Sequence, residues 1–170
     1  MRETGCDAFT GGYTRGALYR RFKENEPLVL AMLDLLDETW SHDVRRPVER
    51  ERDPVAALNA LARGHAAFCR QDLARLAMAL RLDFSSPDDP VGRRLEQAAD
   101  GLVRRCACLI EAGRRLGAIP AGPPARTVAM AFIGATEGTA IQLSGQTPHD
   151  QALAARAAAG VLGLDHQSVS

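Results

Sequence analysis

Three proline-containing pairs divide the chain into helical segments: Asp53-Pro54, Asp89-Pro90 and Thr147-Pro148. In each pair the first residue can cap a helix, and proline suits the first helical position. Between these points apolar residues recur with helical spacing, which predicts helices over about 26–42, 55–69, 73–84, 91–113, 126–143 and 148–163. The charged run 45–53 is predicted to be a polar connection. No alternating Val/Ile/Thr run or Asn-Gly hairpin turn occurs, so the sequence predicts an all-α fold.

The composition fits one helical domain and argues against several other classes of protein. The 170 residues are 46% apolar, which is enough for a core, and the strong helix formers alanine, leucine and arginine are abundant. No apolar stretch approaches the roughly eighteen residues of a membrane span, and no secretory leader opens the chain. We therefore expect a cytoplasmic protein that does not enter a membrane.

The four cysteines do not suggest a metal site. Cys6, Cys69, Cys106 and Cys108 are scattered, form no Cys-x-x-C motif and have no histidine at a ligand-like spacing. We expect them to be reduced and mostly buried, as free cysteines usually are. No metal and no cofactor is expected.

Basic charge is concentrated at the start of the chain, although the formal net charge is zero. Residues 1–23 hold five basic and two acidic side chains, so this end carries +3 and the remainder −3. Attraction to phosphates depends on local charge and not on the total for the chain. This end therefore suits contact with DNA.

The most informative stretch is 12–22, Gly-Tyr-Thr-Arg-Gly-Ala-Leu-Tyr-Arg-Arg-Phe. Gly12 can form a tight turn, and Thr14 can cap the short helix that follows it. Leu18 and Phe22 provide an apolar edge, while hydroxyl and guanidinium groups occupy the other faces. Such a helix suits the major groove, where hydroxyls and arginines contact phosphates and an arginine can read guanine. From these residues alone, an ordinary surface helix is the alternative.

This stretch, with the Leu-Val-Leu-Ala-Met-Leu run at 28–33, resembles the TetR-type family of bacterial transcription regulators. Segments 110–119 and 131–138 resemble the end of that family's long central helix and the glycine-containing helix after it. The resemblance implies a partial helix-turn-helix in residues 1–24, shortened by its first helix, and a helical effector-binding and dimerisation domain in residues 25–170. The residues that it implies for DNA contact are Tyr13, Thr14, Arg15, Gly16, Tyr19, Arg20 and Lys23.

The helices within 26–143 are expected to enclose a pocket for a small apolar or aromatic effector, because helix bundles hold ligands between facing helices. The candidates are aromatic, sulfur-containing and polar residues on apolar faces. For each of them a place in the core is the alternative: a histidine on an apolar stripe is more often a hydrogen-bonded core residue. The candidate lining residues are Trp40, His65, Phe68, Met78, Phe84, Cys106, Met130, Phe132, Glu137 and Gln142.

The helix predicted over 126–143 is apolar on every face, with Val-Ala-Met-Ala-Phe-Ile-Gly-Ala at 128–135. Such a helix is buried all round, so we expect its own core on one side and a second subunit on the other. The alanine-rich last helix would complete a four-helix interface, since small side chains allow close packing. The predicted partner is a second copy, bound through helices near 124–145 and 148–164; a monomeric core is the alternative.

Together these features predict a ligand-responsive transcription regulator, a repressor that releases double-stranded operator DNA when its effector binds. The alternative is a ligand-sensing helical dimer that has lost DNA binding, because only eleven residues precede Gly12. An enzyme is not expected, since the chain has no glycine-rich phosphate loop, nucleophile elbow or paired-histidine zinc motif.

Overall fold

The computed structural model describes residues 24–83, 88–143 and 149–164. Within these ranges the chain is helical and contains no strand, so the all-α prediction is confirmed. The residues predicted to contact DNA, and Phe84 of the predicted pocket, lie outside these ranges. The elements are α2 (Glu26–Trp40), η1 (Ser41–Arg45), α3 (Arg46–Arg50), α4 (Pro54–Phe68), α5 (Asp72–Asp83), α6 (Pro90–Arg115), α7 (Ala125–Gln142) and α8 (His149–Val161).

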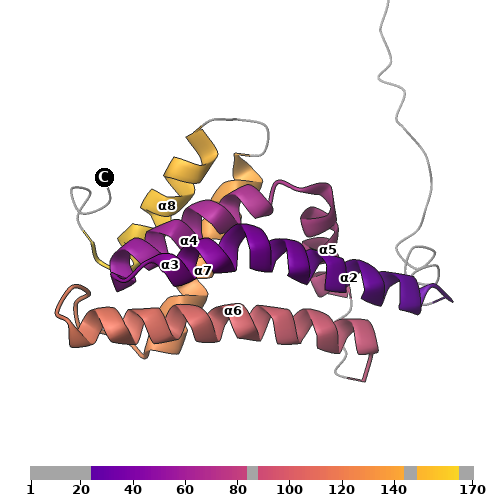
Figure 1. Cartoon of the computed structure of the whole chain (residues 1–170), viewed down its shortest axis with the longest axis horizontal. Helices are drawn as coiled ribbons and strands as arrows, with labels where there is room; N and C mark the ends of the chain where they lie inside the picture. Colours follow the sequence, from indigo (N-terminus) through magenta and orange to yellow (C-terminus); the bar gives the residue numbers. More distant parts are fainter. Residues whose placement is uncertain (1–23, 84–87, 144–148, 165–170) are drawn as a thin grey trace, which may run out of the picture.

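The longest helix, α6, lies along one side of the molecule, and α2 runs beside it (Figure 1). Helices α4, α7 and α8 pack against one another, and α4 and α7 also pack on α6. The short helix α5 contacts α2 and α6 near the start of both. No helix of the described residues is long and apolar enough to cross a bilayer. The bundle therefore has a thick end around α4, α7 and α8 and a thinner end closed by α5.

Two of the proline-containing pairs begin helices as the sequence predicts. The Asp53 carboxylate accepts a hydrogen bond from the backbone N–H of Ala56 at 2.7 Å, at the start of α4. Asp89 does the same for Val91 and Gly92, at 2.9 and 3.2 Å, at the start of α6. Both aspartates satisfy N–H groups that have no partner within the helix. The third pair, at 147–148, lies outside the described residues.

The predicted polar connection over 45–53 is wrong, because the helical chain continues from α2 through η1 and α3 to Arg50. Pro47 lacks an N–H, and its ring would clash with the carbonyl four residues earlier in a regular α-helix. The wider turn of the π-helix η1 lies over residues 41–45, where this strain would arise. Val44 and Val48, four residues apart within the charged run, are both buried in the core. Their spacing was the signal for a helix.

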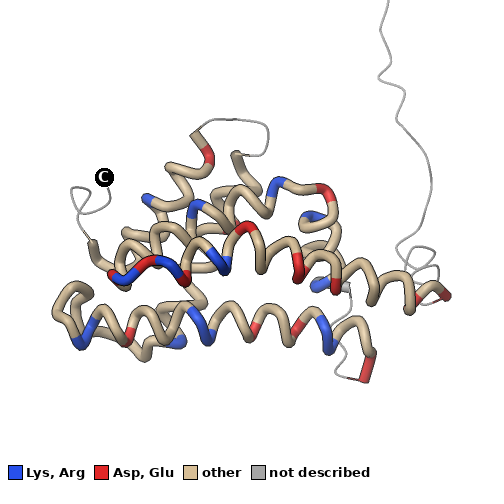
Figure 2. Tube along the Cα trace, viewed as in Figure 1, with Lys and Arg blue, Asp and Glu red and all other residues tan. Residues whose placement is uncertain are grey.

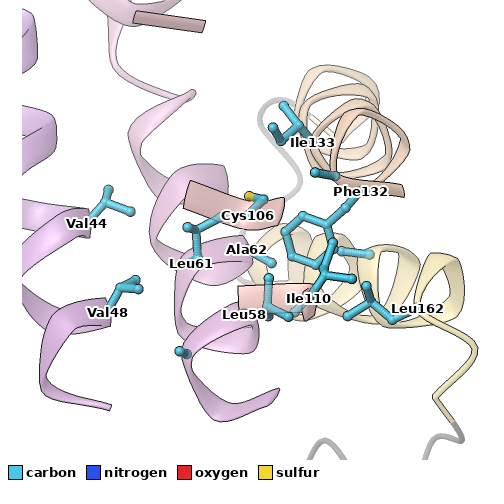
Figure 3. Close-up of a cluster of buried hydrophobic side chains, with 14 of the residues drawn as sticks. Val44, Val48, Leu58, Leu61, Ala62, Cys106, Ile110, Phe132, Ile133 and Leu162 are labelled. Carbon is cyan, nitrogen blue, oxygen red and sulfur yellow. The ribbon is translucent and has the colours of Figure 1, made fainter. Parts of the chain in front are cut away.

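The main core lies where α4, α6, α7 and α8 meet (Figure 3). Leu58 and Leu61 from α4 and Ile110 from α6 are fully buried, and they surround Phe132 of α7. Burial of each such side chain stabilises the fold by about 1.5–3 kcal/mol. This packing holds α4 and α7 in fixed positions beside α6.

Candidate ligand-binding site

A cavity of about 310 Å³ lies between α2, α4, α5, α6 and α7. Its volume is near the lower end of the usual range for small-molecule sites, about 300–1,000 Å³. The wall is mainly apolar, with polar and charged side chains at several points. The apolar side chains of the wall are Leu33, Leu36, Phe68, Ala74, Ala77, Met78, Leu95, Ala98, Ala99 and Leu102.

Helical periodicity explains why these residues share one cavity. Residues 33, 36, 37 and 40 form one face of α2, and residues 74, 77, 78 and 81 form one face of α5. Residues 94, 98, 101, 102 and 105 follow the same rule along α6. Side chains three or four positions apart lie on the same side of a helix. The faces of α2, α5 and α6 therefore meet without filling the space between them, and the space that remains is part of the cavity.

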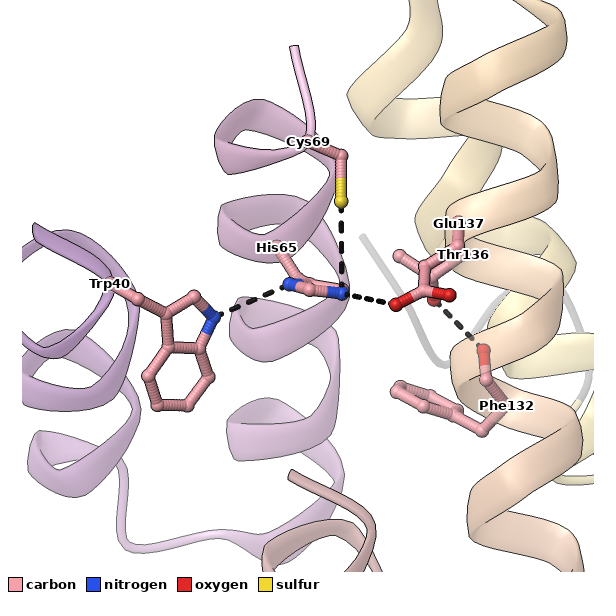
Figure 4. A network of polar contacts seen from close by, with 6 residues as sticks. All are labelled: Trp40, His65, Cys69, Phe132, Thr136 and Glu137. Atoms are coloured by element: carbon pink, nitrogen blue, oxygen red, sulfur yellow. Dashed lines mark hydrogen bonds and ion pairs between the residues drawn. The ribbon is translucent and has the colours of Figure 1, made fainter. Parts of the chain in front are cut away.

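A polar cluster forms one part of the wall (Figure 4). The Trp40 indole N–H donates to Nδ1 of His65 over 3.3 Å. Nε2 of His65 lies 3.2 Å from a carboxylate oxygen of Glu137 and 3.7 Å from the sulfur of Cys69. His65 and Cys69 come from α4, Trp40 from α2 and Glu137 from α7. The cluster thus joins three helices through one imidazole ring.

The surroundings of His65 favour its protonated form. Burial of the ring opposes protonation, whereas the Cys69 sulfur and then the Glu137 carboxylate favour it. The balance raises the pKa of His65 from 6.5 to about 9. A buried imidazolium is stable here because a carboxylate pairs with it.

Trp40 and Glu137 favour opposite states of the ring. Nδ1 can accept the indole N–H only when that nitrogen carries no proton, which is the neutral ring. A protonated ring would direct a second N–H at the indole N–H. We expect the contact with Glu137 to prevail, because a charge-assisted bond in a buried site is stronger than a long neutral one. Protonation of His65 therefore weakens its contact with Trp40.

The cluster contains the side-chain types of a nucleophilic triad but not the arrangement. In a triad, one ring nitrogen faces the nucleophile and the other faces the carboxylate. Here both Cys69 and Glu137 face Nε2, and Nδ1 faces Trp40. Within the described parts of the chain, no group of three or more His, Cys, Asp or Glu residues could hold a metal ion. The arrangement suits hydrogen bonding to a bound molecule.

The structure brings five of the predicted lining residues to this cavity: Trp40, His65, Phe68, Met78 and Glu137. Four of the others lie elsewhere. Cys106 and Phe132 are buried in the main core, while Met130 is 58% exposed and Gln142 is also exposed. Helix α7 is apolar on all sides, so sequence alone does not show which of its faces meets α4.

Sequence reasoning missed the four arginines of the cavity wall, Arg45, Arg81, Arg94 and Arg105. Two of them could have been found from spacing. Arg81 lies three residues after Met78, and Arg105 lies three residues after Leu102, so each shares a face with an apolar wall residue. Arginine can line such a cavity because its long aliphatic stem packs on apolar neighbours.

Comparison with known proteins finds no matching family model, no matching curated protein and no matching solved structure. The resemblance to TetR-type regulators therefore stays a prediction from the sequence. Any functional assignment depends on the cavity, on the surface of the bundle and on the residues at 12–22.

Proposed function

We propose that this protein is a ligand-responsive, DNA-binding transcription regulator, and that a small effector with an apolar or aromatic body binds in the cavity. The observation that carries the proposal is the cavity itself, about 310 Å³ with an apolar wall and a polar cluster around His65. A cavity of this size with a few converging polar groups is the usual form of a small-molecule site.

The position of α2 supports a link between this cavity and DNA. Leu33, Leu36 and Trp40 of α2 line the cavity, so a bound molecule would contact this helix directly. The segment 12–22, which we predict to read DNA, ends only four residues before α2 begins at Glu26. An effector that binds better to one position of α2 than to another would shift the population of that position. The spacing of two recognition helices on DNA would then change.

The outer faces of α7 and α8 support a dimer. Charged residues are concentrated on α2, α3 and α6, whereas α7 and α8 carry few (Figure 2). Met130, Ile141 and Leu153 on these two helices are exposed. A Cβ placed on Gly134 or Gly138 would meet no atom within 4 Å. An exposed face of small and apolar residues suits close packing against a second copy, with α7 and α8 of each copy in one four-helix interface.

Gly134→Arg tests this interface without disturbing the subunit. The new side chain would project into open space in one subunit but would block close approach of a second α7. Light scattering after size-exclusion chromatography should give twice 18.3 kDa for the natural chain and 18.3 kDa for the variant. Arg63→Gln, on an exposed position of α4, is the control and should stay dimeric. A natural chain that runs as a monomer at micromolar concentration would refute the interface.

Fluorescence anisotropy with DNA from the region beside the protein's own gene tests DNA binding. We expect salt-dependent binding by the full chain, with weaker binding and a salt slope lower by about one for each phosphate contact that Arg15→Gln or Arg20→Gln removes. Arg63→Gln should bind as the natural chain does. Absence of salt-dependent binding at micromolar protein concentration would reject the proposal that the protein is a DNA-binding regulator. Ligand binding without DNA binding would support the alternative, a ligand-sensing dimer.

A further inference from the structure

The charges on the cavity wall are not balanced. Its carboxylates already have basic partners: Glu137 is paired with His65 at 3.2 Å, and Asp37 with Arg94 at 3.5 Å. Two of the wall arginines also form ion pairs with carboxylates outside the wall. Arg94 also contacts Asp34 at 3.1 Å, and Arg105 contacts Glu49 at 3.2 Å.

The other two wall arginines, Arg45 and Arg81, have no ion pair with any residue that the structure describes. Arg45 is half-buried, and Arg81 is exposed. A partly buried guanidinium that lacks an anion has lost hydration without gaining a partner. The wall therefore carries an excess of positive charge, which would attract an anionic ligand and repel a cationic one.

Arg45 lines the same cavity as the polar cluster. The side chain of Val44, its neighbour in the chain, lies 3.3 Å from the Cβ position of Gly64, which precedes His65. Arg45 follows Trp40 by five residues, and Arg105 lies over the Trp40 ring at 6.0 Å from its centroid. A guanidinium, an indole N–H and an imidazole are thus available from neighbouring segments, while Leu33, Ala77 and Leu95 supply an apolar wall from other parts of the cavity.

We infer that the effector is a small hydrophobic organic acid, whose anionic group pairs with Arg45 while Arg81 adds to its attraction into the cavity. Arginine binds a carboxylate through two parallel hydrogen bonds, and such bonds are strong where water is scarce. The volume limits the size of the acid, because about 310 Å³ is near the lower end of the usual range for small-molecule sites. This inference rests on the proposed function, because it names the ligand class of the same cavity.

Isosteric pairs of an acid and its amide test the inference, because they differ in charge and hardly in shape. Phenylacetate with phenylacetamide, and octanoate with octanamide, have bodies of suitable size. Trp40 is the only tryptophan of the chain and lies in the wall, so intrinsic fluorescence reports binding directly. We expect one of the two acids to bind about ten-fold more tightly than its amide, or better.

Variants assign the preference to the two arginines. Arg45→Gln should remove most of the preference for the acid and leave the affinity for the amide unchanged. Arg81→Gln should have a smaller effect, and the double variant should bind acid and amide alike. Arg63→Gln, an exposed α4 arginine that does not line the cavity, should keep the full preference. Thermal unfolding of each variant shows that the fold is retained.

Three results would overturn the inference: equal affinity for acid and amide, a preference that survives in the double variant, or no saturable fluorescence change with either acid at millimolar concentration. The proposed regulation of DNA binding can be refuted separately from the ligand class. An acid preference that depends on Arg45, together with no effect on DNA, would keep the ligand class and reject regulation. Release of DNA by the acid and the amide alike would support regulation and reject the ligand class.

Discussion

The two sides of the bundle use the same types of side chain but pack them differently. Around Phe132, where α4, α6, α7 and α8 meet, one remaining void measures about 10 Å³, too small for more than about one water molecule. The cavity between α2, α4, α5, α6 and α7 measures about 310 Å³. Leucines occur on both sides, yet Leu58 is fully buried and Leu36 is only partly buried.

The difference arises from the helices that close each side. In the core, α7 and α8 bring small residues that allow close approach, so Phe132 and Ile110 fill the space between helices. On the other side α2 packs on α6 and the short α5 contacts both of them, without filling the space that they share with α4 and α7. The comparison indicates that the tight side supplies most of the stability and that the open side is available for binding.

The largest effect that we expect comes from truncating the same residue type on each side. Leu58→Ala should lower the free energy of unfolding by about 3–4 kcal/mol, because it leaves a cavity that the dense core cannot fill. Leu36→Ala should cost less, about 1–2 kcal/mol, since its side chain is only partly buried and borders the cavity. Urea unfolding followed by circular dichroism measures both. Equal losses would show that the two sides pack alike in solution.

The second prediction concerns how stability depends on pH, and it involves only the side of the bundle that holds the cavity. The pKa of His65 is raised to about 9 in the folded protein, above its value of 6.5 in an unfolded chain. Its contribution to stability is therefore complete below pH 6.5 and is lost as the pH rises through 9, by up to about 3 kcal/mol.

Urea unfolding across this pH range tests the second effect. His65→Gln should remove the fall in stability, whereas Leu58→Ala should lower the whole curve and keep its slope. A slope that is unchanged in His65→Gln would contradict the pairing of His65 with Glu137.

The smallest effect comes from two glycines of the same helix, α6. A Cβ at Gly113 would lie 2.6 Å from a methyl carbon of Ile119, which is itself buried, so Gly113→Ala should cost about 1–3 kcal/mol. A Cβ at Gly101, on the cavity wall, would meet only an arginine tip at 4.0 Å. Gly101→Ala should stabilise the protein by about 0.5–1 kcal/mol. Thermal unfolding compares them, and shifts of the same sign would contradict this contrast in packing.

Much of the helical framework could be predicted because it depends on local rules. Asp53 and Asp89 cap α4 and α6 through contacts with residues two or three positions away. The π-helical turn before Pro47 was missed, because charged residues around Val44 and Val48 resemble a loop. Whether such a segment coils or stays helical depends on a core into which its two valines can be buried.

The sequence by itself determined that the described chain is helical and which face of α2 and of α5 is apolar, because spacing along one helix depends only on that helix. Only the tertiary structure decided where those faces meet. It placed His65 between Trp40 and Glu137, from segments 25 and 72 residues away, and it turned Met130 outward. The physical reason is that a cavity is the space that packed helices leave unfilled. The residues around it belong to several helices, and no single segment determines how those helices are placed relative to one another.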